Sequence, residues 1–123
     1  MAGLAEAIKR SLAAQEPTGG TLRLVRQFIM ELDHCGDPAD MFRDEPPSTG
    51  DQRWDALIAG VVEDFALHQG MEPPDWVFNG QRFLSTWWFL TSIDNMRPTA
   101  IAQAPAALSN RGVFVQRASL LNA

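Results

Sequence analysis

The sequence predicts a mainly α-helical fold, a small helical domain with a short β element near the C-terminus. Apolar residues recur at helical spacing over residues 21–36 and 51–69, whereas residues 113–115 are the only stretch typical of a strand. A chain of 123 residues with 46% apolar and 20% charged residues has the composition of a folded domain of ordinary size. We therefore expect residues 1–123 to form a single domain.

Two helices are expected in the N-terminal part. Residues 2–15 are rich in alanine and carry only a narrow apolar stripe, so we expect residues 1–20 to be flexible or to form a loosely packed helix. Thr21 offers a hydroxyl group for the N-cap of a second helix, and Gly36 supplies its C-terminal stop. Residues 37–50 then predict one short helical turn followed by a proline-rich loop.

The strongest helical pattern covers residues 51–69. Asp51 or Thr49 can cap its first turn, and Gly70 ends it before two prolines that prevent the helix from resuming. Its apolar side chains fall within one arc of the helix, which predicts the centre of the core. We expect this core to contain Trp54, Leu57, Val61 and Phe65, together with Phe28, Ile29 and Leu32 of the second helix.

The C-terminal third has a less regular pattern. The aromatic segment, residues 76–90, follows neither the period of a strand nor that of a helix, which favours several short elements. Residues 99–108 predict a helix in two pieces around Pro105. Residues 110–112 predict a turn before the strand at 113–115, whose partner is either an extended part of the aromatic segment or another chain.

Charge is segregated along the chain. Residues 31–75 contain twelve acidic residues and two arginines, a balance of −10, whereas residues 1–30 carry +2 and residues 76–123 carry +3. An acidic surface repels the phosphate backbone, and no basic stripe is present, so we expect no direct nucleic acid binding by this chain alone. The same surface would attract a basic protein partner.

Several other classes of function lack a signal. No apolar run approaches the ~20 residues that span a bilayer, and the single cysteine, Cys35, cannot form an internal disulfide, so we expect a cytoplasmic protein without membrane contact. Asp33, His34, Cys35 and His68 are too few for a typical zinc site, and no catalytic or phosphate-binding motif occurs. We expect no metal, no cofactor, no catalytic residues and no enzymatic activity.

One polar pair lies beside the apolar face of the long predicted helix. Asp64 and His68 are four residues apart, so a helix places their side chains next to each other. Such a pair can act as a pH-sensitive contact, whereas the commoner alternative is a boundary histidine satisfied by one hydrogen bond. Both interpretations stay open at this point.

The aromatic segment is the main candidate for binding. Three of the four tryptophans lie within it, and each brings on the order of 150–250 Å² of surface, so it must form core, pocket or interface. Trp87 and Trp88 are adjacent and cannot both point the same way, so we predict that at least one lines a groove or an interface. The candidate residues for binding a partner or ligand are Trp76, Arg82, Trp87, Trp88 and Arg97.

Six segments together form a distinctive pattern; they are residues 45–57, 74–76, 82–84, 87–89, 104–108 and 111–115. They resemble a poorly characterised actinobacterial domain, with the likeness running from about Leu22 to Leu120. The resemblance implies a regulatory domain that usually follows a helix-turn-helix, in some members at toxin-antitoxin-type loci. The residues before Leu22 are too few for a helix-turn-helix, so the resemblance implies sensing or partner docking without DNA contact.

Three functions remain in competition. The first is a non-enzymatic interaction module of antitoxin or regulator type, which uses acidic residues for steering and the aromatic segment as an anchor for a basic protein. The alternative is a sensor domain that binds a small molecule in a tryptophan-lined pocket. The third is an enzyme that uses His68, Asp64 and Cys35. A homodimer is compatible with each of them.

Overall fold

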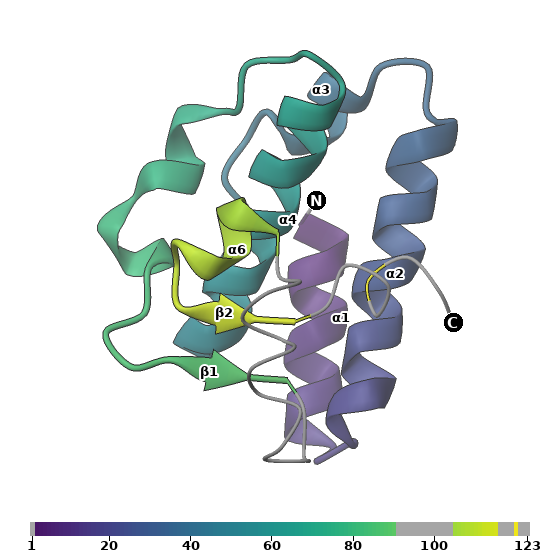
Figure 1. Ribbon diagram of the computed structural model, residues 1–123. Coiled ribbons are helices and arrows are strands. Elements are labelled where there is room, and N and C mark those ends of the chain that lie inside the picture. Colours follow the sequence, from purple (N-terminus) through teal and green to yellow (C-terminus); the bar gives the residue numbers. More distant parts are fainter. Residues whose placement is uncertain (1, 91–104, 116–119, 121–123) are drawn as a thin grey trace.

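The computed structural model describes residues 2–90, 105–115 and 120, and it confirms the mainly helical fold class (Figure 1). Three long helices and one helix of five residues come first along the chain. They are α1 (Ala2–Ala13), α2 (Thr18–His34), α3 (Pro38–Phe42) and α4 (Gln52–His68).

Short elements follow, as the irregular aromatic pattern predicted. They are the 3₁₀ helices η1 (Asp75–Phe78) and η2 (Gly80–Arg82), the strands β1 (Trp88–Phe89) and β2 (Val113–Phe114), and helix α6 (Ala106–Ser109). Helix α6 begins directly after Pro105, where the second helical piece was expected, while residues 99–104 lie outside the described residues.

Helices α1 and α2 form an antiparallel hairpin that packs more closely than expected (Figure 1). Ala5 and Ile8 are buried in α1, so the N-terminal helix belongs to the core. Helix α2 begins at Thr18, one turn before the expected start, because the carbonyl of Pro17 accepts the first backbone hydrogen bonds. The hydroxyl of Thr21 is not a cap; it forms a buried hydrogen bond with Ser11 Oγ at 2.6 Å.

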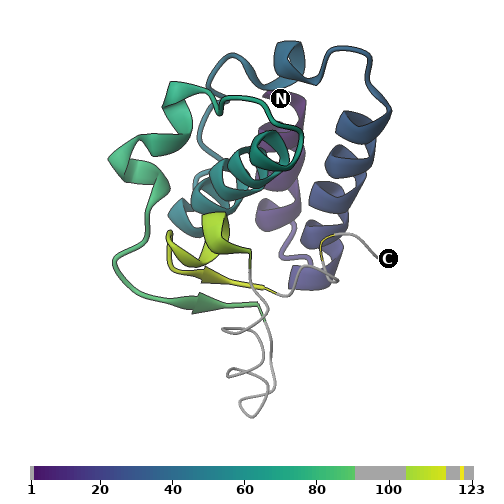
Figure 2. The same cartoon turned by 45° about the horizontal axis from the view of Figure 1, so that its top comes forward.

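Helix α4 lies between this hairpin and the short C-terminal elements (Figure 2). Its start is confirmed at the N-cap Asp51, whose side chain accepts a hydrogen bond from the backbone N–H of Arg53 at 2.8 Å. Burial opposes ionisation of Asp51, but the hydrogen bonds and charge of Arg53 outweigh it and hold the pKa of Asp51 below its ordinary value. Gly70, with φ +69°, allows the chain to turn away after His68.

The core predicted from helical spacing is confirmed, since every one of its members is less than 9% exposed. They are Trp54, Leu57, Val61, Phe65, Phe28, Ile29 and Leu32. The buried residues form two clusters, one around Trp54 and Leu57 and the other around Phe42 and Phe65, whose rings meet edge to face at 6.3 Å. Helix α4 contributes to both clusters and therefore joins the two halves of the interior.

Strand β2 pairs with part of the aromatic segment, which confirms one of the two expected partners. The strands are parallel, with Trp88 opposite Val113 and Phe89 opposite Phe114. The backbone N–H of Trp88 also donates to the carbonyl of Gly112 at 2.8 Å. The aromatic segment is thus held against α4 by a part of the chain that is distant in sequence.

Candidate functional site

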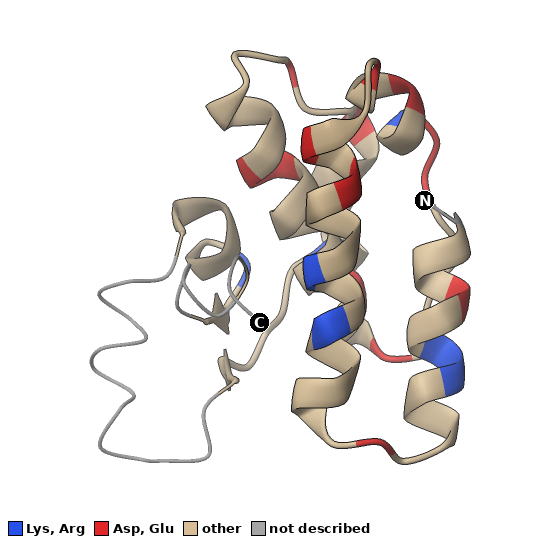
Figure 3. Cartoon of the chain, turned by 90° about the vertical axis from the view of Figure 1, so that its right-hand side faces the viewer, with Lys and Arg blue, Asp and Glu red and all other residues tan. Residues whose placement is uncertain are grey.

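Acidic residues gather at one end of the molecule. Helices α2 and α4 both end there, and Figure 3 shows red segments concentrated around these ends and α3, with most blue segments along the middle of α1 and α2. The negative ends of two helix dipoles therefore lie in the most acidic part of the protein, an arrangement that disfavours stability and favours a cationic partner. The acidic residues of this end, called the acidic end below, are Asp33, Asp37, Asp40, Asp44, Asp64, Glu72 and Asp75.

A hollow of about 560 Å³ opens beside the acidic end. Arg43 lies on its wall but is paired with Asp40 at 3.0 Å. Within the described part of the chain, the exposed carboxylates of Asp44, Glu72 and Asp75 form no hydrogen bond or ion pair. The hollow is lined by Arg43, Asp44, Glu45, Glu72, Pro73, Pro74, Asp75 and Trp76, and is called the acidic hollow below.

Trp76 is the aromatic member of the acidic hollow. It is half-buried, and its indole N–H donates to the backbone carbonyl of Phe42 at 2.9 Å. The guanidinium of Arg82 lies 5.0 Å from its ring centroid, within the range of a cation–π contact. The position of the ring in the wall is therefore fixed by the interior, while part of its surface faces the hollow.

Arg82 was expected to face a partner, and this expectation is wrong. The residue is only 4% exposed, because its guanidinium donates to the carbonyls of Asp55 and Pro46, each at 3.1 Å, and pairs with Glu45 at 3.2 Å. These contacts join the loop before α4 to α4 itself. Arg82 therefore positions Glu45 and Trp76 and does not offer a free charge.

A second hollow, of about 360 Å³, lies at the N-terminal end of α4. Both tryptophans of the predicted pair line it, which confirms that at least one of them borders a groove. It is lined by Gln52, Arg53, Leu84, Ser85, Thr86, Trp87 and Trp88, and is called the tryptophan hollow below.

The two adjacent tryptophans have different surroundings. Trp88 is half-buried; its ring meets Trp54 edge to face at 5.1 Å, and Arg53 lies over it at 5.1 Å. Trp87 is 63% exposed and contacts Phe114 at 4.9 Å. Trp88 is thus the fixed wall of the tryptophan hollow, and Trp87 offers most of its ring surface to solvent. The remaining candidate, Arg97, lies outside the described residues.

Asp64 and His68 border a third hollow, of about 210 Å³, between α2 and α4. His68 Nδ1 donates to the backbone carbonyl of Asp64 at 2.8 Å and lies 3.4 Å from its carboxylate. Among the described residues that line this hollow, none carries a hydroxyl or thiol group; they are Ile29, Asp33, Val61, Asp64, Phe65, His68, Gln69 and Leu120. Cys35, the thiol that the enzyme hypothesis would use beside His68 and Asp64, is not among these lining residues.

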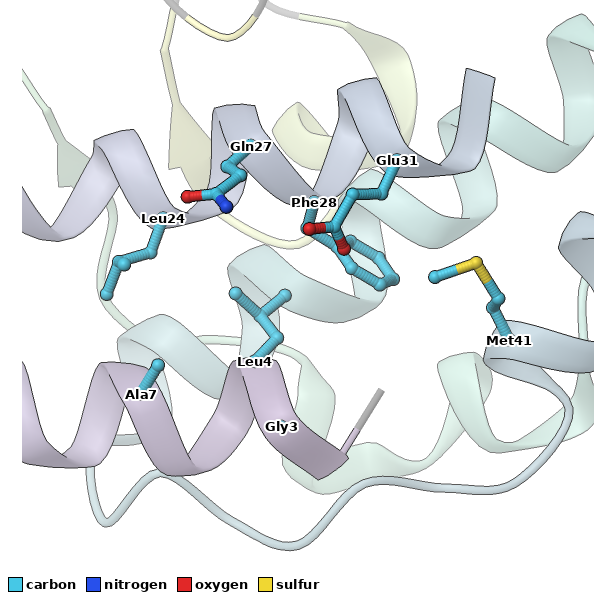
Figure 4. Close-up of a pocket in the computed structure, with 8 residues that line it drawn as sticks. All are labelled: Gly3, Leu4, Ala7, Leu24, Gln27, Phe28, Glu31 and Met41. Carbon is cyan, nitrogen blue, oxygen red and sulfur yellow. The ribbon is translucent and has the colours of Figure 1, made fainter. Parts of the chain in front are cut away.

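An apolar groove runs between α1 and α2 (Figure 4). Leu4 and Phe28 form its floor, and Met41 of α3 reaches toward it from one end. Its volume is about 290 Å³, and it is lined by Gly3, Leu4, Ala7, Leu24, Gln27, Phe28, Glu31 and Met41. It is called the hairpin groove below. The sequence pattern did not indicate it, because a narrow apolar stripe predicts only contact with the core.

Sequence reasoning also missed the buried arginine that supports the C-terminal elements. Arg111 is 1% exposed, pairs with Glu63 of α4, and donates to the carbonyls of Ala107 and Val77 at 2.8 and 2.5 Å. Phe83 lies beneath its guanidinium at 4.6 Å. An arginine in a turn is ordinarily exposed, so no local signal indicated this role.

Comparison of the chain with protein-family models, with curated proteins and with solved structures gave no match. Within the described ranges, no group of three histidine, cysteine, aspartate or glutamate side chains is arranged to hold a metal ion. None of the helices in the same ranges combines the length and apolar character needed to cross a bilayer.

Proposed function

We propose that this protein is a non-enzymatic interaction module of antitoxin or regulator type, whose acidic hollow binds a basic segment of a protein partner. The observation that carries the proposal is the hollow of about 560 Å³ in which carboxylates surround a fixed tryptophan. The expected anchor is Trp76, because Trp87 and Trp88 lie near the opposite end of α4.

The chemistry of the acidic hollow suits arginine and lysine side chains. Asp44, Glu72 and Asp75 can each accept a charge-assisted hydrogen bond from a guanidinium or ammonium group. Pro73 and Pro74 offer apolar surface to the aliphatic stems of such side chains. Because the carboxylates are exposed, their contribution is expected mainly in the rate of association and in its dependence on salt.

A defined basic peptide tests the proposal. A short peptide of alternating arginine and alanine is titrated into the protein by calorimetry at low and at physiological salt. We expect binding that weakens as salt rises, while a peptide with glutamate in place of arginine does not bind. Equal affinity for both peptides, or no affinity for the basic one, would contradict the proposal.

Two matched variants locate the binding site. Glu72→Gln removes one charge from the acidic hollow, whereas Glu6→Gln makes the same change at an exposed position of α1. An exposed ion pair contributes about 0.2–1 kcal/mol, so Glu72→Gln should weaken binding by up to about fivefold. Glu6→Gln should leave the affinity within error of the native protein. The same loss in both variants would show non-specific attraction to the net charge.

The tryptophan hollow favours a second candidate function, the binding of a planar small molecule. Trp87 and Trp88 offer ring surface, and Gln52, Arg53 and Thr86 place polar groups at its rim. Benzoate, which combines a ring with a carboxylate, is the probe. Trp87→Ala should abolish its binding, whereas Phe78→Ala, which removes another exposed ring outside this hollow, should not. Benzoate binding that survives Trp87→Ala would reject this site.

A further inference from the structure

The third hollow, of about 210 Å³ between α2 and α4, combines an apolar floor with an acidic rim. Asp33 and His68 are exposed and Asp64 is half-buried, so these polar side chains lie at its rim. The floor is formed by side chains that are each less than 9% exposed, namely Ile29, Val61, Phe65 and Leu120. An apolar cavity with a few convergent polar groups is the usual form of a small-molecule site.

Helical spacing brings the parts of this site together. Ile29 and Asp33 are four residues apart, so they share one face of α2. Val61, Asp64 and His68 follow each other at spacings of three and four, so they share one face of α4. Each helix therefore presents an apolar side chain first and a carboxylate one turn nearer to its C-terminal end.

Negative charge dominates the rim of the third hollow. Asp33 forms no hydrogen bond or ion pair with the described residues, and the described lining contains no lysine or arginine. Helix α2 ends at His34 and α4 at His68, so the negative ends of two helix dipoles lie at this rim, among the red segments of Figure 3. The rim therefore attracts a cation and repels an anion.

The floor decides which kind of cation fits. A metal ion needs several polar ligands, and the described residues contain no group of three that could hold one. An organic ammonium ion with an apolar body suits both parts of the hollow, because its N–H groups donate to carboxylates and its body covers the apolar floor. The volume lies below the ~300–1,000 Å³ of sites for drug-sized ligands, so the body is limited to about one ring or a short branched chain.

We infer that the third hollow is a binding site for a small primary amine with an aromatic or branched apolar body. The ammonium group lies between Asp33 and Asp64, and the body lies against Val61 and Phe65. The site shares no residue with the acidic hollow, so it adds a second class of ligand to the proposed protein partner. It does not depend on the proposed function, because its test uses a small amine and no basic peptide.

Three probes with the same ring and different head groups test the inference. Phenethylamine is a cation at pH 7.5, as a lysine side chain is, whereas phenethyl alcohol is neutral and phenylacetate is an anion. Each is titrated into protein with labelled methyl groups and followed by NMR. With the amine we expect saturable shifts at Ile29, Val61 and Leu120, and none at Leu4 and Leu24 of the hairpin groove. The alcohol should bind at least about tenfold more weakly, and phenylacetate should not bind.

Asp33→Lys and Asp37→Lys form a matched pair of variants. Both residues are exposed at the acidic end, but only Asp33 lines the third hollow. Asp33→Lys exchanges an attraction for a repulsion of similar size, so it should weaken phenethylamine binding about tenfold, whereas Asp37→Lys should change the affinity less than about twofold. A lysine is favourable near the C-terminal end of α2, so loss of folding does not explain the expected result. Trp87→Ala should leave the affinity unchanged, because Trp87 belongs to the tryptophan hollow.

Several outcomes would overturn the inference. One is equal binding of phenethylamine and phenylacetate, and another is no binding of phenethylamine at millimolar concentration. An equal loss of affinity in Asp33→Lys and Asp37→Lys would show non-specific attraction to the net charge. Tighter binding of N-acetyl-lysine amide than of phenethylamine would assign the hollow to a lysine side chain of a protein partner, and the inference of a small-amine site would then be wrong.

Discussion

Gly60 lies in the interior of α4, where the structure makes a sharp prediction about an added methyl group. A Cβ built on Gly60 would clash with Leu108 Cδ2 and would lie 3.0 Å from Leu108 Cγ. Leu108 belongs to α6 and is fully buried, at 0% exposure, so its side chain has little room to move away. Gly60→Ala should therefore push α6 away from α4.

Two effects of known size oppose each other in this variant. Alanine is favoured over glycine in a helix interior by about 0.8–1.0 kcal/mol. Overpacking a well-filled core costs about 1–3 kcal/mol. Because the clash involves two atoms of a fully buried leucine, we expect the second effect to prevail and the free energy of unfolding to fall by about 1 kcal/mol. The melting temperature should fall by about 4 °C.

Urea unfolding followed by circular dichroism measures this change, and two variants control it. Gly19→Ala makes the same substitution in α2, where an added Cβ meets no atom within 4 Å, and should be neutral or stabilising by up to about 1 kcal/mol. In a Leu108→Ala background the clash disappears, so Gly60→Ala should become stabilising there. The reasoning would be refuted if Gly60→Ala were as stable as Gly19→Ala in the native background. It would also be refuted if Gly60→Ala destabilised the Leu108→Ala variant as much as it destabilises the native protein.

Further predictions concern the charged and aromatic groups described above. Glu63→Ala leaves the buried charge of Arg111 without its carboxylate, so the free energy of unfolding should fall by about 3 kcal/mol in urea titrations; an unchanged value would show that the two carbonyl contacts suffice. Asp51→Ala removes the cap of α4 and should cost about 1 kcal/mol. The pKa of Asp51 is lowered from 3.8 in the folded protein, so the charged side chain stabilises the fold fully above pH 3.8, and this stabilisation is lost as pH falls through the lower folded pKa. The stabilities of the native protein and of Asp51→Asn should therefore converge in acid. A stability difference that stays constant with pH would contradict this prediction. Trp87→Ala should change stability by less than about 1 kcal/mol, because the ring is 63% exposed, and a larger loss would show a structural role for this ring.

The helices and the core could be predicted because they depend on local patterns. Helix α4 combines a capping residue, one apolar arc and a terminal glycine, and each of these signals acts within a few residues. The predicted core residues are buried for the same reason. A local pattern gives a wrong prediction where a side chain contacts another helix. Thr21 was predicted as an N-cap, but its hydroxyl forms a hydrogen bond with Ser11.

The hollows proposed as binding sites were less accessible to sequence reasoning. Arg82 and Arg111 are among the four arginines of the C-terminal third, and local composition does not show which of them will be buried. The acidic hollow joins residues 43–45 to residues 72–76, and this junction depends on Trp76 donating to the carbonyl of Phe42. The acidic excess was visible in the sequence, but its concentration around one hollow results from tertiary packing.

The pairing of β1 with β2 has a consequence for the order in which the protein folds. Trp88 and Val113 are 25 positions apart, whereas the hairpin of α1 and α2 forms through contacts between neighbouring elements. Contacts between distant residues require closure of a longer loop and generally form later. During synthesis, Trp87 and Trp88 therefore leave the ribosome before the strand that fixes them. In this interval the tryptophans lack their contacts with β2, so this apolar segment is then open to a chaperone.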